Sequence, residues 1–261
     1  MSFSTNVIVL CGPTASSKSK IAFELSKLYD SVIINADSMQ IYKEFPILTG
    51  QPLKETTNKV SHKLYGFVKY DQEYSVFHWF NTVKSEIEST KKNIIIIGGT
   101  GLYITCLLNG MIDNNDNILK LTSLTDVIYN KNNLEYLTKF KQHNTNINDT
   151  YRILRDYRHH LAYRVNKMPQ YDKIPEIINA KIFYIKKDRH FIRKKAEINF
   201  LNMIEQGAIG EVKNYLKSNN NPKNKIIGIK PIIDYLDNKI TKDKMISLAL
   251  NDTNKYIKRQ Y

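Results

Sequence analysis

The chain has 261 residues, of which 42% are hydrophobic, so it can bury one large core or a core that carries an insertion. No run approaches the roughly 20 apolar residues of a membrane span, and the N-terminus lacks a secretory signal, so we expect a cytoplasmic protein without membrane contact. The 39 Lys and Arg residues against 25 Asp and Glu give a net charge of +14, which favours a polyanionic partner.

The chain contains two cysteines, Cys11 and Cys106, and both lie in apolar segments. We therefore expect them to be small core residues rather than parts of a disulfide or a zinc site.

The N-terminal part alternates apolar runs with helical patterns. Residues 6–11 form an apolar run that ends at a Gly-Pro pair, which predicts a buried parallel strand entering a loop. A helix is predicted over residues 18–29, with Ile21, Ala22, Leu25 and Leu28 on one face. Further strands are predicted at residues 32–35, 64–68 and 93–97. This alternation predicts an α/β fold, a doubly wound parallel sheet of the P-loop class with its ligand site at the carboxyl ends of the strands.

The composition changes in the middle of the chain, where Lys, Asn, Tyr and Arg dominate and strand signals are few. We predict a small helical insertion domain over residues 113–179, which separates a first core part, residues 1–112, from a completing part, residues 180–261. In the completing part we predict a strand at residues 181–186 and helices at residues 191–216 and 245–257.

A glycine-containing loop connects the first strand to the first helix, the position of a phosphate-binding loop. Its residues, all predicted to bind diphosphate, are Gly12, Pro13, Thr14, Ala15, Ser16, Ser17, Lys18 and Ser19. Backbone amides would hold the phosphate, Lys18 would neutralise it, and the Ser19 hydroxyl would ligate Mg²⁺. The alternative is an ordinary strand-to-helix turn. Ser17 replaces the glycine of the pattern, and a left-handed conformation there would cost about 1–2 kcal/mol.

A carboxylate, Asp37, follows the second predicted strand and therefore lies at the carboxyl edge of the sheet, beside the phosphate loop. A carboxylate at this place can act as a general base or as a magnesium ligand. The alternative is that Asp37 only caps a following helix.

Several separated motifs occur in a characteristic order along the chain: GPTAS at residues 12–16, NADSMQIYK at 35–43, ILTGQP at 47–52, HKLYGF at 62–67, YSV at 74–76, GGTGLYI at 98–104, NDTYRILR at 148–155, IGIK at 227–230 and KRQ at 258–260. Together they resemble the tRNA dimethylallyltransferase family over essentially the whole chain. The resemblance implies transfer of a prenyl group from dimethylallyl diphosphate, with Mg²⁺, to the N6 amine of the adenosine 3′ of the tRNA anticodon.

The same resemblance implies roles for individual residues. Asp37 corresponds to the base of the family, and Thr100 to a residue near the leaving diphosphate, although Thr100 is also suited to capping a helix. The residues implied in binding the tRNA anticodon loop are Asp37, Ser38, Met39, Gln40, Thr100, Tyr151, Arg152, Ile153, Leu154 and Arg155. Arg152 and Arg155 would share one helical face, which suits phosphate contact or base stacking, whereas a solvated basic helix is the alternative. We expect a monomer.

Three departures from the family pattern predict reduced activity. They are Ser17, Asn199 in place of an arginine for the diphosphate, and a chain that stops at Tyr261 where relatives continue. Losing the charged hydrogen bond of that arginine would cost about 1.5–3 kcal/mol. Two rival functions therefore remain open from the sequence: a catalytically weak RNA-binding member of the same family, and a P-loop small-molecule kinase that uses the same loop for ATP.

Overall fold

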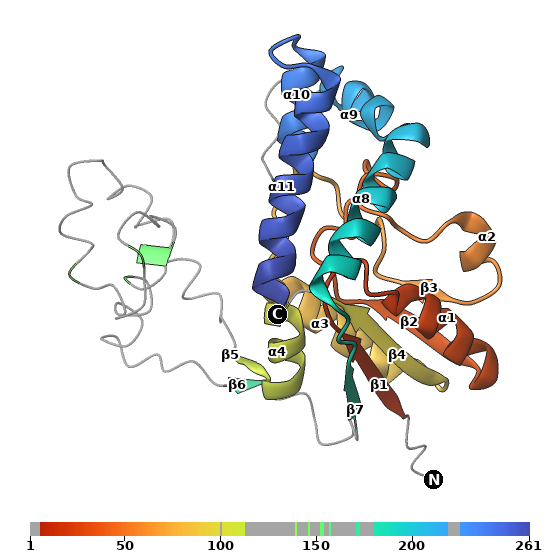
Figure 1. Ribbon diagram of the computed structural model, residues 1–261. Coiled ribbons are helices and arrows are strands. Elements are labelled where there is room, and N and C mark those ends of the chain that lie inside the picture. Colours follow the sequence, from red (N-terminus) through yellow and green to blue (C-terminus); the bar gives the residue numbers. More distant parts are fainter. Residues whose placement is uncertain are drawn as a thin grey trace. The chain divides into compact units, whose positions relative to one another are not determined.

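The computed structural model describes residues 6–99, 101–112, 180–218 and 225–261, together with Lys139, Asn146, Arg152, Ile153, Tyr157, Tyr171 and Asp172 (Figure 1). By its internal contacts the chain divides into two compact units. Unit 1 consists of Met1–Asn109 and Ile174–Tyr261, and unit 2 of Gly110–Lys173. The predicted ends of the insertion, residues 113 and 179, lie outside the described residues.

Unit 1 contains a parallel sheet of five strands in the order β3-β2-β4-β1-β7. The strands are β1 (Val7–Cys11), β2 (Ser31–Asn35), β3 (His62–Lys63), β4 (Asn93–Gly98) and β7 (Ala180–Tyr184). Val9 of β1 and Ile34 of β2 are both in register with Ile96 of β4, so the three central strands end at one edge. The predicted α/β fold with a parallel sheet is thus confirmed.

Both faces of the central strands are buried, as expected for a parallel sheet with helical cover. On one face Leu10, Ile33 and Ile95 pack with Ala22 of α1 (Lys18–Leu28). The residues that alternate with these, including Val9 and Ile96, are fully buried on the opposite face. α3 (Val76–Ser89) and α4 (Gly101–Asn109) pack on each other, with the rings of Trp79 and Tyr103 stacked at 4.5 Å.

A second core lies between the segment that follows β2 and the C-terminal helices. These helices are α8 (Arg189–Glu205), α9 (Ala208–Leu216), α10 (Ile229–Leu236) and α11 (Lys242–Gln260), and α2 (Lys54–Thr57) is a short helix before β3. At its centre the ring of Phe45 lies 4.8 Å from that of Tyr70 and 5.2 Å from that of Tyr215. Residues 41–48, next to the Asp37 motif, are therefore supported by the C-terminal part of the chain (Figure 1).

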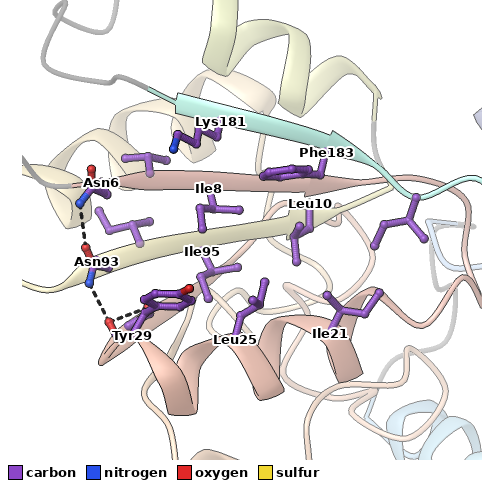
Figure 2. Close-up of a pocket in the computed structure, with 14 residues that line it drawn as sticks. Asn6, Ile8, Leu10, Ile21, Leu25, Tyr29, Asn93, Ile95, Lys181 and Phe183 are labelled. Atoms are coloured by element: carbon purple, nitrogen blue, oxygen red, sulfur yellow. Dashed lines mark hydrogen bonds between the residues drawn. The ribbon is translucent and has the colours of Figure 1, made fainter.

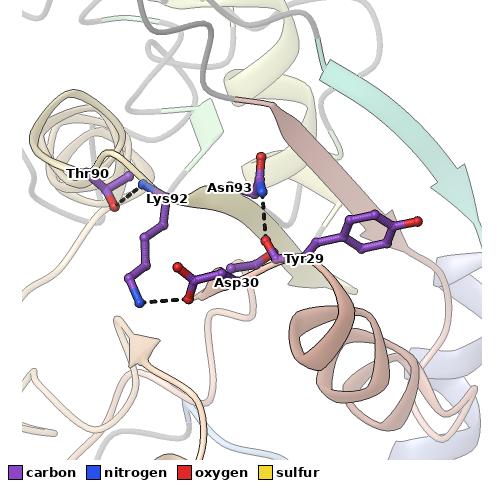
Figure 3. Close-up of polar contacts among 6 residues, drawn as sticks. Tyr29, Asp30, Thr90, Lys92 and Asn93 are labelled. Carbon is purple, nitrogen blue, oxygen red and sulfur yellow. Dashed lines mark hydrogen bonds and ion pairs between the residues drawn. The ribbon is translucent and has the colours of Figure 1, made fainter.

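The ends of two helices are joined to the amino ends of the strands by polar contacts (Figure 3). The Asn93 side chain donates to the Tyr29 carbonyl at 2.7 Å, and the Lys92 ammonium lies 2.8 Å from the Asp30 carboxylate. Because that ion pair is exposed, it contributes little stability. The contacts fix the sheet at the edge opposite to the phosphate loop.

Two predicted elements are wrong in extent. The strand expected at residues 64–68 is instead the two-residue β3 just before them, because Leu64 adopts φ 63° and Gly66 φ 51°, which turn the chain out of the extended conformation. The helix predicted over residues 191–216 is two helices, α8 and α9, separated at Gly207, whose φ of 108° no helix can contain.

The predicted apolar face of the first helix is only partly buried. Ala22 is inaccessible to solvent, whereas Leu28 is 74% exposed and Ile21 is 37% exposed. Leu28 is the last residue of α1, where the chain turns toward β2, and its side chain faces mostly solvent. Of the two cysteines, both free, Cys106 is buried as predicted and Cys11 is only partly buried.

Unit 2 contains a short antiparallel pair, β5 (Met111–Ile112) with β6 (Tyr171–Asp172). Ile153 and Tyr157 are both buried, and Arg152 is exposed. Across the described residues of both units, no helix has the length and apolar character needed to cross a membrane.

Candidate active site

The loop between β1 and α1 has the backbone of an anion-binding turn. Ser17, the N-cap of α1, has φ 71° and ψ 21°, and Ala15 has φ 60°. No side chain caps the helix, so the amides of its first turn, including those of Lys18 and Ser19, have no intrahelical acceptor. Such free amides at a helix N-terminus bind phosphate. Gly12 is required, because a Cβ there would lie 2.7 Å from the carbonyl oxygen of Ile185.

Lys18 is folded back along this loop. Its ammonium donates to the carbonyls of Gly12 at 3.0 Å and Pro13 at 2.7 Å. Burial lowers the pKa of Lys18 to about 8, and the nearby charge of Asp37 acts in the opposite direction. The hydroxyl of Ser16 is fully buried and has no partner among the described residues. The loop therefore holds an enclosed lysine ammonium whose pKa lies close to physiological pH. The free amides at the start of α1 lie beside it.

Asp37 follows β2 in a turn that its neighbour Asn35 shapes. The buried Asn35 side chain accepts from the Asp37 amide at 2.9 Å and donates to the carbonyls of Asp37 and Leu64, each at 3.0 Å. The Asp37 carboxylate accepts from the Met39 amide at 2.9 Å. No helix follows, so Asp37 is not a helix cap; it shapes a local turn. Burial raises the pKa of Asp37, while the Met39 amide and Lys18 lower it.

Aromatic side chains lie near Asp37 and its turn. Trp79 donates its indole N–H to the Asn35 carbonyl at 2.8 Å and stacks on Tyr103. Burial raises the pKa of both Tyr65 and Tyr103, and the charge of Asp37 raises each further. Both phenols therefore lie within electrostatic range of Asp37 and stay neutral at physiological pH.

The remainder of the NADSMQ motif is built into the fold. The Gln40 side-chain amide donates to the carbonyls of Thr49 at 3.0 Å and Gly50 at 2.9 Å. Gly98, at the end of β4, must be glycine, because a Cβ there would lie 2.2 Å from the carbonyl oxygen of Ala36. The turn after β4 thus lies directly against the segment that carries Asp37.

The donor groups of this site decide which metal it could hold. Among the described residues no three His, Cys, Asp or Glu side chains form a cluster that holds a metal by itself. The available groups are the Ser19 hydroxyl in the first turn of α1 and the Asp37 carboxylate. These few oxygen donors fit Mg²⁺. In proteins this ion usually keeps several waters and is held by one or two protein oxygens together with substrate phosphates.

The predicted loop, residues 12–19, lies near Asp37 in the structure. Lys18 of this loop and Asp37 are close enough for each charge to shift the pKa of the other group. Other predicted site residues lie outside the described residues: Thr100, Tyr151, Leu154 and Arg155. Arg152 and Ile153 belong to unit 2, where the side chain of Ile153 is buried and that of Arg152 is exposed. The predicted tRNA contacts of this segment stay predictions.

A cavity of about 590 Å³ lies elsewhere in unit 1, between α1 and the strands β4, β1 and β7 (Figure 2). Its lining is mainly apolar, with Ile8, Leu10, Ile95 and Phe183 facing it. None of the loop residues 12–19 and no residue of the Asp37 motif lines it. The cavity is therefore separate from the candidate active site.

Sequence reasoning missed several residues of the site. Asn35, Trp79, Tyr65 and Tyr103 support or surround Asp37, and Gln260 of α11 contacts the phosphate loop through the Thr14 amide at 2.8 Å. Each of them lies in or beside a motif already singled out, namely NADSMQIYK, HKLYGF, YSV, GGTGLYI and KRQ. Their roles depend on neighbours far away in the chain, which no local pattern reveals.

A parallel sheet, a glycine-containing loop that leads from β1 directly into a helix, and a carboxylate after β2, separated from β1 only by β4, are the arrangement of a P-loop α/β protein. The family model for IPP transferase matches residues 40–261. The chain belongs to the IPP transferase family.

Curated relatives agree over nearly the whole chain. A tRNA dimethylallyltransferase of Ehrlichia ruminantium is 37% identical over 278 aligned positions, covering 98% of this chain and 90% of the relative. One from Rickettsia bellii is 34% identical, covering 97% of this chain and 86% of the relative.

Solved structures show the same fold. A tRNA isopentenylpyrophosphate transferase from Staphylococcus epidermidis has a TM-score of 0.67 and 23% identity, covering 98% of this chain and 88% of that chain. A eukaryotic dimethylallyltransferase acting on tRNA has a TM-score of 0.79 and 22% identity, covering 98% of this chain and 69% of that chain.

Proposed function

We propose that this protein transfers the dimethylallyl group of dimethylallyl diphosphate to the N6 amine of the adenosine 3′ of the anticodon in tRNA. Membership of the IPP transferase family and relatives named tRNA dimethylallyltransferase support prenyl transfer over the kinase alternative. The observation that carries the chemistry is that the Lys18 ammonium, held on the Gly12 and Pro13 carbonyls, lies within electrostatic range of the Asp37 carboxylate after β2.

In the reaction the adenine N6 forms a bond to the allylic carbon while the bond from that carbon to the diphosphate oxygen breaks. The N6 lone pair is delocalised into the ring, so the amine becomes a nucleophile only as a base removes its proton. Asp37 accepts that proton, and the raised pKa of its carboxyl makes it a stronger base than an exposed aspartate. The neighbouring turn of Asn35 holds the Asp37 backbone in place.

The departing diphosphate takes the electrons of the broken bond and gains negative charge. Lys18 and the free amides at the start of α1 stabilise this charge, since fixed donors and cations act strongly in an enclosed site. Mg²⁺, held through the Ser19 hydroxyl and the diphosphate oxygens, would add positive charge to the leaving group. The neutral phenols of the buried Tyr103 and the partly buried Tyr65 keep the surroundings of Asp37 poor in water.

On the RNA side, the net charge of +14 supplies a general attraction to tRNA. Ser38, Met39 and Gln40 next to Asp37, and the segment at residues 151–155, are the proposed positioning contacts. We further propose that the enzyme acts as a monomer in the cytoplasm, where tRNA is modified.

The test is mass analysis of nucleosides from tRNA incubated with the protein, Mg²⁺ and dimethylallyl diphosphate. We expect prenylated adenosine next to the anticodon. Asp37→Ala should lose about 10²–10⁴-fold of the rate, the usual contribution of a general base, while binding tRNA as wild type does. Wild-type turnover by Asp37→Ala would remove Asp37 from the mechanism. Phosphate transfer from ATP to a small acceptor, without prenylation, would establish the kinase alternative.

A further inference from the structure

The last residue of α11, Gln260, joins two parts of the active site that are far apart in sequence. Its side-chain oxygen accepts from the Thr14 amide at 2.8 Å, and its side-chain nitrogen donates to the Gly99 carbonyl at 2.8 Å. Thr14 belongs to the phosphate loop after β1, and Gly99 to the turn after β4. One carboxamide therefore bridges the carboxyl ends of two neighbouring strands.

The contact at Gly99 is tight. A Cβ at Gly99 would lie 2.3 Å from the Gln260 side-chain nitrogen and 3.1 Å from the Gly12 carbonyl oxygen. Real Cβ atoms do not approach other atoms to 2.3 Å. Any side chain at position 99 would thus displace Gln260, and the glycine of the GGTG motif is needed for the bridge.

The end of α11 is held in this position by further contacts. Tyr184 donates its hydroxyl to the Gln260 carbonyl at 3.0 Å. Ile257, which is 1% exposed, packs with Ile192 and Ala196 of α8, and Ala15 of the phosphate loop packs against the same cluster. The end of α11 therefore contacts the phosphate loop through the Gln260 side chain, and Ala15 of that loop packs against the cluster that Ile257 forms with α8.

The beginning of α11 lies in the second core. Met245 and Ala249 are fully buried there with Ile41 and Phe45, which follow the Asp37 motif. Helix α11 thus contacts the segment that follows Asp37 at its start and the phosphate loop after β1 at its end (Figure 1). Catalysis needs these two parts at a constant distance, because a displacement of about 1 Å can cost about 100-fold in rate.

We propose that Gln260 is a positioning residue for the diphosphate. By occupying the Thr14 amide and the Gly99 carbonyl, it fixes the phosphate loop against the turn after β4, so that Lys18 and the amides that follow Thr14 meet the leaving group in one geometry. The inference rests on the proposed function for the identity of the ligand, but its test uses binding of inorganic pyrophosphate, which needs no prenyl transfer.

The test compares Gln260→Met, which retains the length of the side chain and loses both hydrogen bonds, with the full-length wild type. Two neutral hydrogen bonds correspond to about tenfold in affinity. We expect pyrophosphate, titrated calorimetrically with Mg²⁺, to bind about tenfold more weakly, kcat for prenylation to fall at least as much, and KM for tRNA to change less than about twofold.

Tyr184→Phe is the matched control, because it removes one hydrogen bond from the same helix end and leaves the carboxamide bridge in place. It should bind pyrophosphate within about twofold of wild type. Equal losses in Tyr184→Phe and Gln260→Met would assign the effect to docking of the helix and overturn the proposal. An unchanged pyrophosphate affinity in Gln260→Met would also overturn it.

Gly99→Ala provides an independent route that does not depend on the folding of Gln260→Met. The added methyl group should displace Gln260 and weaken pyrophosphate binding at least as much, since it also lies close to the Gly12 carbonyl of the loop. Because both changes break one bridge, the double variant should bind no more weakly than Gly99→Ala alone. Fully additive losses would contradict the bridge.

The outcome for Gln260 can be separated from the outcome for the proposed function. If the wild type binds pyrophosphate normally but prenylates no tRNA, the proposed function is refuted and the role of Gln260 stands.

Discussion

Ser17 holds a conformation that is unfavourable for any residue with a Cβ. Its φ of 71° lies in the left-handed region, and no side-chain hydrogen bond to the helix compensates. Only the short polar residues Asn and Asp visit this region with some ease, and for others it costs about 1–2 kcal/mol. The strain predicted from the sequence at this position is therefore present in the structure.

Replacing Ser17 by glycine should relieve this strain. We expect Ser17→Gly to bind pyrophosphate more tightly, by up to about tenfold, because the loop then adopts its phosphate-binding conformation without cost. Ser17→Ala, which retains the Cβ and loses only the hydroxyl, should bind as wild type does. Weaker binding by the glycine variant in the same titration would mean that the loop has adapted to serine.

Lys18 and Asp37 influence each other across the site, and their burial has opposite consequences. Burial lowers the pKa of the lysine to about 8 and raises that of the aspartate. Both shifts favour the neutral forms, so the unliganded site resists carrying charge. A bound diphosphate reverses this for Lys18, since an anion stabilises the ammonium.

The affinity for pyrophosphate should therefore depend on pH through Lys18. Below its pKa of about 8 the lysine is charged and binds the anion, and above it the neutral amine cannot. Relative to Lys18→Arg, whose guanidinium stays charged, wild-type affinity should fall about tenfold between about pH 7 and about pH 9. The ratio of the two proteins cancels the titration of pyrophosphate itself. A constant ratio over this range would show that Lys18 does not titrate there.

Helix α9 stabilises a loop that is remote in the chain. The Glu211 carboxylate accepts from the Ile47 amide at 2.7 Å and from the Leu48 amide at 2.9 Å, and burial raises the pKa of this carboxyl. These amides belong to the ILTGQP motif, whose turn also receives the Gln40 side chain. The position of the NADSMQ segment thus depends in part on Glu211.

Glu211→Gln should destabilise the protein, because one amide oxygen can accept well from only one of the two backbone donors. We expect the free energy of unfolding, measured by urea denaturation, to fall by about 1–3 kcal/mol. Glu205→Gln, at an exposed position near the end of α8, should change it by less than about 0.5 kcal/mol. Equal values for the two variants would show that the Glu211 contacts contribute nothing.

Taken as a whole, the molecule carries 14 more positive than negative charges, which act on any nucleic acid at a distance. Such a field attracts tRNA without selecting a nucleotide. Selection of one adenosine requires contacts in fixed positions, which we propose are made by Ser38, Met39 and Gln40 in unit 1 and by Arg152 and Arg155 in unit 2.

The general and the positioning contacts should separate in binding experiments. Arg152→Ala or Arg155→Ala should weaken tRNA binding by about 1–3 kcal/mol if the arginine stacks on or reads a base. Lys217→Ala, at an exposed position of unit 1, should cost less and mainly reduce the salt dependence. Wild-type tRNA binding and prenylation by both arginine variants across a salt titration would show that Arg152 and Arg155 do not contact tRNA.

Local patterns were sufficient for the parts of the fold in which the signal is contiguous. The apolar runs of β1, β2 and β4, the loop at residues 12–19 and the place of Asp37 after β2 all follow from neighbouring residues. A buried parallel strand needs a continuous apolar run, and a phosphate loop needs its glycine and lysine in one short segment. The charge of the chain and its family resemblance are likewise readable without coordinates.

Other features were decided by contacts between distant residues. Leu64 ends β3 in a left-handed turn whose carbonyl accepts from Asn35, and Gly207 divides what looked like one long helix. Trp79 donates to the carbonyl of Asn35, which lies 44 residues earlier in the chain. The Gln260 side chain accepts from the amide of Thr14, which lies 246 residues earlier. A hydrogen bond of this kind leaves no periodic trace in either segment, because its geometry exists only after the strands and helices have packed.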